Sequence, residues 1–112
     1  MKALVITEAS RGIGLGHLIR SAVAGFALKV GLNAKVQLII KGDNIEHSIL
    51  TRLKSQWTPN FNTSQEFFES ADIVVVDVQR IDQNVRLLLK EKSALRVGID
   101  VDLDDAHLFD LI

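Results

Sequence analysis

Short apolar runs recur along the chain, and each has the length of a strand that is buried on both faces. Continuous runs of this kind are typical of parallel sheets, in which helices cover both faces. We therefore predict a mostly parallel sheet with the first run at its centre. The predicted strands are Ala3–Thr7, Val36–Ile40, Ile73–Val76 and Leu95–Ile99.

The segment after the first run has helical periodicity instead. A helix should begin near Gly16 and end near Gly31, a glycine suited to the position just after a last helical turn. Apolar residues at helical spacing predict the side that faces the sheet. They are Ile19, Val23, Phe26, Ala27 and Val30.

A second helix is predicted after the second strand, with Asp43 or Asn44 as its N-cap. Its apolar positions are Ile45, Ile49, Leu50 and Leu53. The segment Gln56–Ser64, which holds the only proline and the only tryptophan, leaves room for a short edge strand without defined ends.

Two further helices are predicted in the second half of the chain. One is short, from Ser64 to Ser70, with Phe67 and Phe68 pointing inward. Asp82 should cap the other. The residues that turn this second helix towards the sheet are Val85, Leu88 and Leu89. The residues His107–Ile112 should begin an extended segment.

Strands that alternate with helices predict right-handed βαβ units. The expected fold class is α/β, a single Rossmann-like, doubly wound, mostly parallel sheet over residues 1–112. A chain of 112 residues fits one domain. Its content of 47% hydrophobic and 24% charged residues is ordinary for a soluble globular protein.

Charge and composition narrow the function classes. Thirteen basic and fourteen acidic residues leave a net charge of -1, no Lys/Arg cluster stands out, and aromatic residues make up only 5%. We therefore expect no nucleic-acid partner. The absence of cysteine excludes disulfides and thiolate metal sites and fits a cytoplasmic protein. No apolar run reaches the roughly 20 residues of a membrane span.

Ligands of doubly wound sheets bind outside the carboxyl ends of the strands, near the switch in strand order. Four polar groups follow the predicted strands: the loop from Thr7 to His17, the turn Gly42–Asn44, Asp77, and the acidic run that begins at Asp100. The topology therefore predicts that the candidate site residues share one edge of the sheet.

The first of these loops has the strongest signal. Gly14 and Gly16 let the backbone approach a ligand closely, and the following helix offers free N–H groups and the positive end of its dipole. That dipole disfavours the imidazolium form of His17, which suits a proton acceptor. Arg20 lies on the same helix face and could hold a phosphate or carboxylate. The alternative is a structural turn, with a solvated histidine and a surface ion pair at Arg20.

The segment from Thr7 to Gly14 also resembles the cofactor loop of short-chain dehydrogenases. Glu8 stands where that family has glycine, and the chain lacks the tyrosine that the family uses in catalysis. The acidic residue expected at the end of the second strand is missing too, because Ile40 is apolar and Asp43 comes late. We therefore expect no dinucleotide cofactor.

The stretch Ile13–Arg20 reads Ile-Gly-Leu-Gly-His-Leu-Ile-Arg. It resembles the nucleotide-sugar hydrolase of pseudaminic acid biosynthesis and its relatives, the SpsG-type spore-coat-polysaccharide proteins, which have a glycosyltransferase-B-like fold. The segments Ile6–Glu8 and Lys41–Asp43 are similar to the SpsG-type branch. The strand before Asp77 and the residues from Gly98 onward also look like that family.

The resemblance implies that this chain is the N-terminal, catalytic-side half of a UDP-sugar hydrolase or glycosyltransferase of surface polysaccharide biosynthesis. His17 would be the base that activates water against the anomeric carbon. The residues implied to bind the substrate are Gly14, Gly16, Arg20, Asp77 and Asp100. No cofactor and no metal are implied.

Two consequences follow from what the chain contains. In this family a C-terminal domain holds most of the nucleotide, and we expect these 112 residues to lack it, so activity should require that domain or a partner chain. Thr7 replaces a basic residue of the family, and Gln79 or Arg80 replaces an aromatic one, so the resemblance does not identify the sugar of the substrate. The alternative function is a stand-alone Rossmann-like binding or assembly module without catalysis.

The remaining polar residues have weaker patterns. The aspartates that follow the last predicted strand could bind a hard cation through oxygen atoms, but they fit a solvated acidic loop better. They are Asp100, Asp102, Asp104 and Asp105. His47 should be exposed, whereas His107 could pack near the site or have a structural role. The apolar end formed by Leu108, Phe109, Leu111 and Ile112 predicts self-association.

Overall fold

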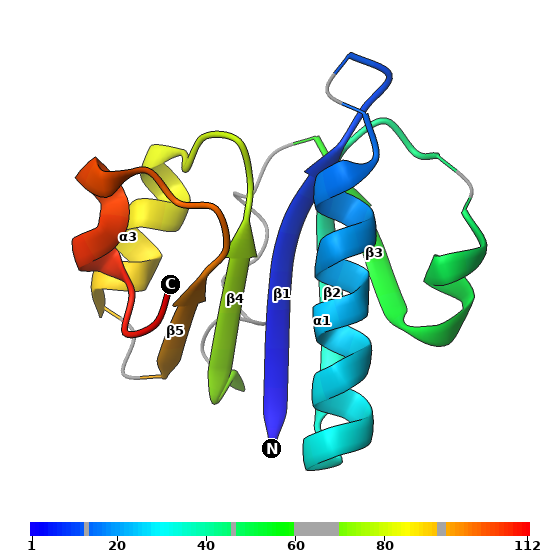
Figure 1. Ribbon diagram of the computed structural model, residues 1–112, viewed down its shortest axis with the longest axis horizontal. Helices are drawn as coiled ribbons and strands as arrows, with labels where there is room; N and C mark the ends of the chain where they lie inside the picture. The colour runs from blue at the N-terminus through cyan, green and yellow to red at the C-terminus, as the bar shows by residue number, and fades with distance from the viewer. Residues whose placement is uncertain (13, 46, 60–69, 92–93) are drawn as a thin grey trace.

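The computed structural model describes residues 1–12, 14–45, 47–59, 70–91 and 94–112. Within these ranges the chain is α/β, and its strands form one all-parallel sheet with the order β3-β2-β1-β4-β5 (Figure 1). The strands are β1 (Lys2–Ala9), β2 (Lys35–Gly42), β3 (Lys54–Thr58), β4 (Ile73–Asp77) and β5 (Leu95–Gly98). The predicted parallel sheet with the first strand at its centre is confirmed.

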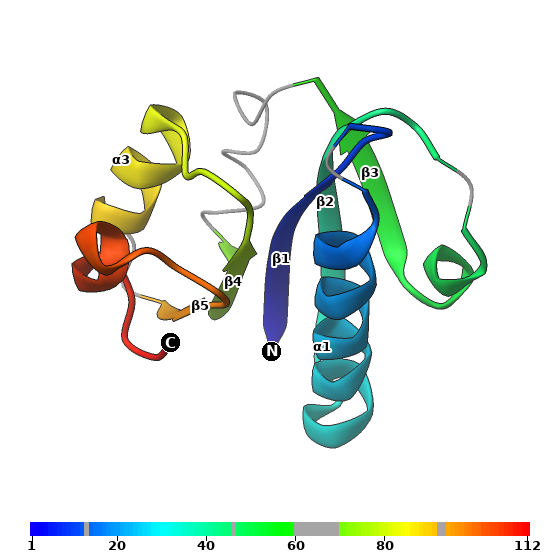
Figure 2. The same ribbon diagram turned by 45° about the horizontal axis from the view of Figure 1, so that its top comes forward.

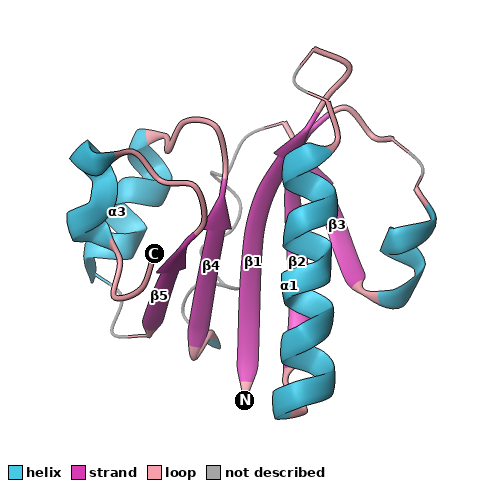
Figure 3. Ribbon diagram, viewed as in Figure 1, coloured by secondary structure: helices cyan, strands magenta, loops and turns pink. Residues whose placement is uncertain are grey.

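Helices cover both faces of the sheet, as in a Rossmann-like doubly wound fold (Figure 3). The helical elements are α1 (Gly16–Leu32), η1 (Ser48–Arg52), α3 (Gln83–Glu91) and η3 (Leu103–Leu108). Ala3 and Val5 of β1 pack in the same cluster as α1, whereas Leu4 and Ile6 pack with α3 and η3. In the turned view, α1 stands beside β1 and β2, and α3 lies with η3 near β5 (Figure 2).

The sheet-facing side predicted for α1 is wrong. The predicted residues are exposed, among them Val23 at 57% and Val30 at 67%. The side chains buried instead are small apart from the first, and they are Leu18, Ser21, Ala22 and Gly25. A Cβ added to Gly25 would lie only 3.2 Å from a methyl carbon of Val36, so small residues let the helix lie close to the sheet. Both stripes have helical spacing, and packing against the strands decided between them.

The end of α1 also differs from the prediction. Gly31 lies inside the helix, and the residue that adopts the left-handed conformation after it is Asn33, with φ of 52°. Asparagine tolerates this conformation better than most residues other than glycine. The helix therefore extends one residue beyond Gly31, to Leu32.

The segment after β2 forms less helix than predicted. Only the 3₁₀ turn η1 is present there, and neither Asp43 nor Asn44 caps it, since the carboxylate of Asp43 accepts a hydrogen bond from the Arg11 N–H at 3.3 Å. An edge strand does follow, but it begins at Lys54, ahead of the predicted segment. The helix predicted from Ser64 to Ser70 lies outside the described residues except for Ser70.

In the second half of the chain, the observed structure of α3 agrees with the prediction made from the sequence. The carboxylate of Asp82 accepts a hydrogen bond from the Val85 N–H at 2.9 Å, which confirms the predicted cap of α3. Val85 and Leu89 are buried, and Leu88 packs against the same cluster. No helix in the described ranges is long and apolar enough to cross a membrane.

The apolar C-terminal end is only half exposed. Leu108 and Phe109 are buried in the core, because η3 turns them inward, so His107 is helical and the extended segment begins at Phe109. Leu111 then lies beside β5, where its carbonyl accepts a hydrogen bond from the Gly98 N–H at 2.8 Å. Of the four apolar residues predicted to promote self-association, only Leu111 and Ile112 are therefore exposed.

Candidate functional site

The candidate site lies where the strand order reverses, between the carboxyl ends of β1 and β4. These strands are neighbours in the sheet, with Thr7 paired to Asp77, although the two residues are 70 positions apart. The chain leaves β1 towards α1 on one face and leaves β4 towards α3 on the other. Crevices at such reversals are where ligands of doubly wound sheets bind.

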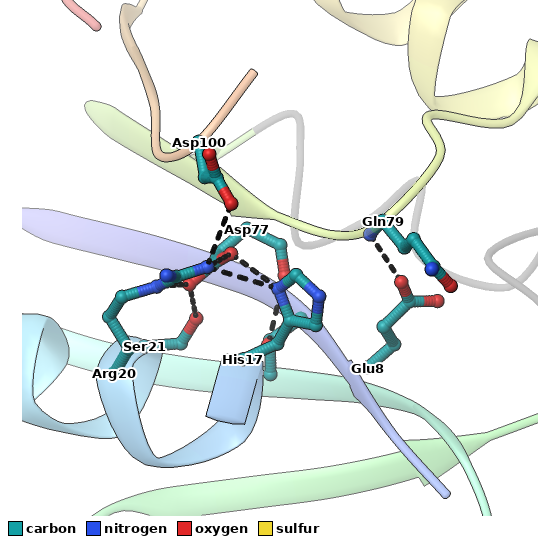
Figure 4. Close-up of polar contacts among 8 residues, drawn as sticks. Glu8, His17, Arg20, Ser21, Asp77, Gln79 and Asp100 are labelled. Atoms are coloured by element: carbon teal, nitrogen blue, oxygen red, sulfur yellow. Dashed lines mark hydrogen bonds and ion pairs between the residues drawn. The ribbon is translucent and has the colours of Figure 1, made fainter. Parts of the chain in front are cut away.

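Asp77 is the centre of a polar cluster there (Figure 4). Its side chain is fully buried at the end of β4. Its Oδ1 lies 2.7 Å from Nδ1 of His17 and accepts a hydrogen bond of 2.7 Å from Nη2 of Arg20. Its Oδ2 accepts hydrogen bonds from Nε of Arg20 at 2.7 Å and from Oγ of Ser21 at 3.2 Å. The first turns of α1 thus enclose both carboxylate oxygens.

The ion pair between Asp77 and Arg20 stabilises the charged form of both side chains. Burial by itself would raise the pKa of Asp77, but the hydrogen bonds from Arg20 and His17 outweigh it and hold that pKa below its ordinary value. The hydrogen bond to Asp77 in turn raises the pKa of Arg20. Asp77 is therefore an anion and Arg20 a cation, joined by a two-point contact. Arg20 was expected to hold a phosphate or a carboxylate, and in the structure its guanidinium holds the carboxylate of Asp77.

The contact with Asp77 orients the imidazole of His17. Because an ionised carboxylate can only accept hydrogen bonds, Nδ1 of His17 carries a hydrogen and donates a hydrogen bond to Asp77. Nη2 of Arg20 lies 3.2 Å from Nδ1. Since Nδ1 is then a donor too, Nη2 donates its hydrogen bond to the carboxylate of Asp77 and not to the ring. The other ring nitrogen, Nε2, points away from Asp77 (Figure 4). The side chain of His17 is 19% exposed, and with Nδ1 protonated the neutral ring has Nε2 as its proton acceptor.

The loop before α1 leaves open space beside His17. Gly14 has φ of 80°, and its N–H donates to the carbonyl of Ser10 at 2.8 Å, which closes a tight turn. Apart from the glycine itself, its chain neighbours and the adjacent helix backbone, no described atom lies within 4 Å of a Cβ built on Gly14 or Gly16. At the start of α1, Leu15 makes no side-chain cap and the first turn holds no acidic residue. The amides of this turn are therefore suited to an anionic group.

Two further contacts join β1 and α1 to neighbouring loops. The carboxylate of Glu8, near the end of β1, accepts a hydrogen bond from the Gln79 N–H in the loop after β4 (Figure 4). Asp100, with φ of 54°, lies after β5 with one oxygen 3.9 Å from Nη2 of Arg20. Its side chain is 74% exposed, so it stands at the rim of the site and remains available to a ligand.

The sequence reading missed two members of the cluster. Ser21 is fully buried and donates to Asp77, and the hydroxyl of Thr7 donates to the backbone carbonyl of Asp77 at 3.0 Å. A signal for Ser21 was present, because His17, Arg20 and Ser21 follow the i, i+3, i+4 spacing of one helix face. Thr7 ends an apolar strand, and only the pairing of β1 with β4 shows its partner.

Other polar residues named from the sequence lie outside the cluster. His107 is exposed on η3, and Asp105 pairs with Arg86 of α3. His47 is partly buried in the loop before η1 rather than fully exposed. Across the described ranges, no three histidine, aspartate or glutamate side chains are grouped as a metal ion would require.

Comparison with known proteins identifies no relative of this chain, since no family model, no curated protein and no solved structure matches it. The Rossmann-like fold therefore rests on the strand order and on the helices that cover both faces.

The ionised state of Asp77 predicts a pH dependence of stability. Because its pKa is lower in the folded chain than in the unfolded chain, its contribution is complete above about pH 4, the ordinary aspartate value. That contribution should be lost as the pH falls through the lower, folded value. Asp77→Asn should be less stable than the wild type at neutral pH, and the difference should narrow in acid.

Urea unfolding between neutral pH and about pH 3 measures this difference. Asp104→Asn is the matched control, because its side chain is exposed and lies outside the cluster. A gap between wild type and Asp77→Asn that stays constant over the whole range would contradict the prediction.

Proposed function

We propose that this chain is the catalytic-side half of a nucleotide-sugar hydrolase or glycosyltransferase, with His17 as the general base. One observation carries the proposal: Nδ1 of His17 lies 2.7 Å from the buried carboxylate of Asp77 at the switch point of the sheet. A histidine held by a carboxylate in this way is oriented for proton transfer through its other nitrogen. The resemblance of residues 13–20 to the SpsG-type loop supplies the substrate class.

The proposed chemistry assigns each group one role. Nε2 of His17 takes a proton from water, or from an acceptor hydroxyl, as that oxygen attacks the anomeric carbon. The bond between the anomeric carbon and the diphosphate oxygen breaks, and the nucleoside diphosphate leaves with the bonding electrons. Asp77 stabilises the imidazolium that forms, and Arg20 keeps Asp77 ionised.

The substrate would sit over the loop at Gly14 and Gly16. Neither glycine has a described atom within 4 Å of its built Cβ position, so a sugar or phosphate can approach the backbone there. The first amides of α1 would face negative charge that develops on the leaving group. Asp100 at the rim would accept hydrogen bonds from sugar hydroxyls. A nucleotide-binding domain or partner chain would hold the rest of the substrate.

A second candidate is a binding or assembly module without catalysis. The exposed apolar stripe of α1 favours it, since Ile19, Val23, Phe26 and Val30 are all more than one-third exposed. Such a module would need no oriented histidine. The two candidate functions therefore differ in whether His17 takes part in ligand binding and proton transfer.

NMR of the chain tests the proposal directly. Long-range ¹H–¹⁵N spectra should show the neutral form of His17 with its proton on Nδ1. Titration with UDP-N-acetylglucosamine should shift the amides of Gly14, Gly16 and His17 selectively, and weak binding is expected because the proposal assigns most of the nucleotide contacts to a second domain or partner chain. Two results would refute the proposal: a proton on Nε2 of neutral His17, or shifts that avoid this loop at millimolar ligand. The assembly module alone predicts no shift at all in this loop.

A further inference from the structure

A cavity among the described residues lies at the opposite edge of the sheet from His17. It has a volume of about 580 Å³ and opens at the amino ends of β1, β2 and β3, beside the last turn of α1. Small-molecule sites in proteins fall in the range of roughly 300–1,000 Å³. The cavity therefore has room for an organic molecule and not only for a simple ion.

Four lysines from four different elements line this cavity. Lys2, Lys35 and Lys54 are the first residues of β1, β2 and β3, and Lys29 lies in the last turn of α1. Among the described residues that line the cavity, none is an aspartate or a glutamate. Within the described ranges none of the four makes an ion pair, and Nζ of Lys29 donates only to the backbone carbonyl of Arg52 at 3.2 Å.

This concentration of charge contrasts with the rest of the chain. The net charge is -1, yet four of the thirteen Lys and Arg residues line one cavity, and none of its described lining residues carries a carboxylate side chain. Like charges that share a concave surface repel one another, and field lines from such a surface attract anions. A bound polyanion would remove this repulsion.

The interior of the cavity is apolar below the lysines. Ala3, Ala34, Val36, Leu53 and Ala71 are buried side chains that line it. The side chains of Asn33 and Gln37 add hydrogen-bonding groups at its wall. A ligand that fits both parts has an apolar or aromatic body and a highly charged anionic end.

We propose that this cavity binds a soluble organic phosphate, with the phosphate groups on the lysines and the organic body on the apolar floor. Lysine is a point-charge phosphate ligand that adapts to several geometries. No aromatic side chain is among the described residues that line the cavity, so none of them offers a platform for base stacking along a strand, which argues against nucleic acid as the occupant. The site is independent of the proposed catalytic cluster, which lies at the other edge of the sheet.

Adenosine diphosphate and inorganic pyrophosphate are suitable probes for the full chain, with amide chemical shifts as the readout. Both should shift Ala34 and Gln37, and the nucleotide should bind more tightly because only it has an organic body. The double variant Lys35→Gln/Lys54→Gln should weaken nucleotide binding about tenfold or more, since each lysine supplies a charge-assisted contact. Lys90→Gln, an exposed lysine of α3 outside the cavity, is the matched control.

Several results would overturn the proposal. They are the absence of shifts at Ala34 and Gln37 at millimolar probe, an equal loss of affinity in Lys90→Gln, and equal affinity for pyrophosphate and the nucleotide. Binding only to single-stranded DNA or only to phosphatidylglycerol vesicles would likewise exclude a soluble organic phosphate. Because the readout residues are remote in sequence from Gly14–Arg20, failure here leaves the proposed function standing, and the reverse also holds.

Discussion

Replacing His17 with alanine should reduce the turnover of a nucleotide sugar by about 10²- to 10⁴-fold, the usual contribution of a general base. The assay supplies the chain together with the nucleotide-binding domain or partner chain and measures release of the nucleoside diphosphate. The loss should fall mainly on kcat, since Nε2 acts in the transition state and Gly14 and Gly16 remain to contact the substrate.

Folding should survive this substitution. Arg20 and Ser21 would still donate to Asp77, so the variant should lose only about 1 kcal/mol of unfolding free energy. Asp77→Asn should also lower kcat, because an amide no longer stabilises the imidazolium. Lys90→Ala on α3 is the matched control and should have full activity. An active His17→Ala enzyme, with correct folding shown by its amide spectrum, would disprove the assignment of His17 as base.

Replacing Gly42 with alanine should cost about 3 kcal/mol or more of the free energy of unfolding, a large part of what a domain of this size has. Gly42 has φ of 131°, a conformation that side chains rarely adopt. A Cβ there would lie 2.0 Å from the carbonyl oxygen of Ala9, its partner in the parallel register. That oxygen belongs to the backbone, so the ends of β1 and β2 would have to separate.

Two other glycines provide graded controls in the same urea titration. Gly14→Ala should cost about 1–2 kcal/mol, because φ is 80° but the space beside it is open. Gly31→Ala should stabilise the chain by up to about 1 kcal/mol, because this glycine lies in α1 with nothing near its built Cβ. Equal midpoints for Gly42→Ala and wild type would show that the strand ends yield, and would contradict the prediction.

The strands were predictable because their signal is local. A buried parallel strand is apolar at consecutive positions, so Ile73–Val76 could be read from the sequence without knowing its neighbours. The cap of α3 at Asp82 was readable for the same reason, since the carboxylate bonds an amide three residues away. The second predicted helix failed where its pattern was sparse, and only η1 formed.

The buried face of α1 shows where local patterns stop. Large apolar residues predict the inner face when size decides, but here Ser21, Ala22 and Gly25 face the sheet because the helix lies close to it. The position of the helix axis follows from the strands beneath it, which no window of sequence contains.

The candidate site divides in the same way. The sequence by itself determined the α/β class, the central first strand, the glycine loop and the presence of His17 at the start of a helix. Only the tertiary structure shows that Asp77 is the buried centre of the cluster and that Arg20 and Ser21 both donate hydrogen bonds to its carboxylate. The physical reason is the pairing of β1 with β4, which brings together side chains that are 56 to 60 residues apart in the sequence.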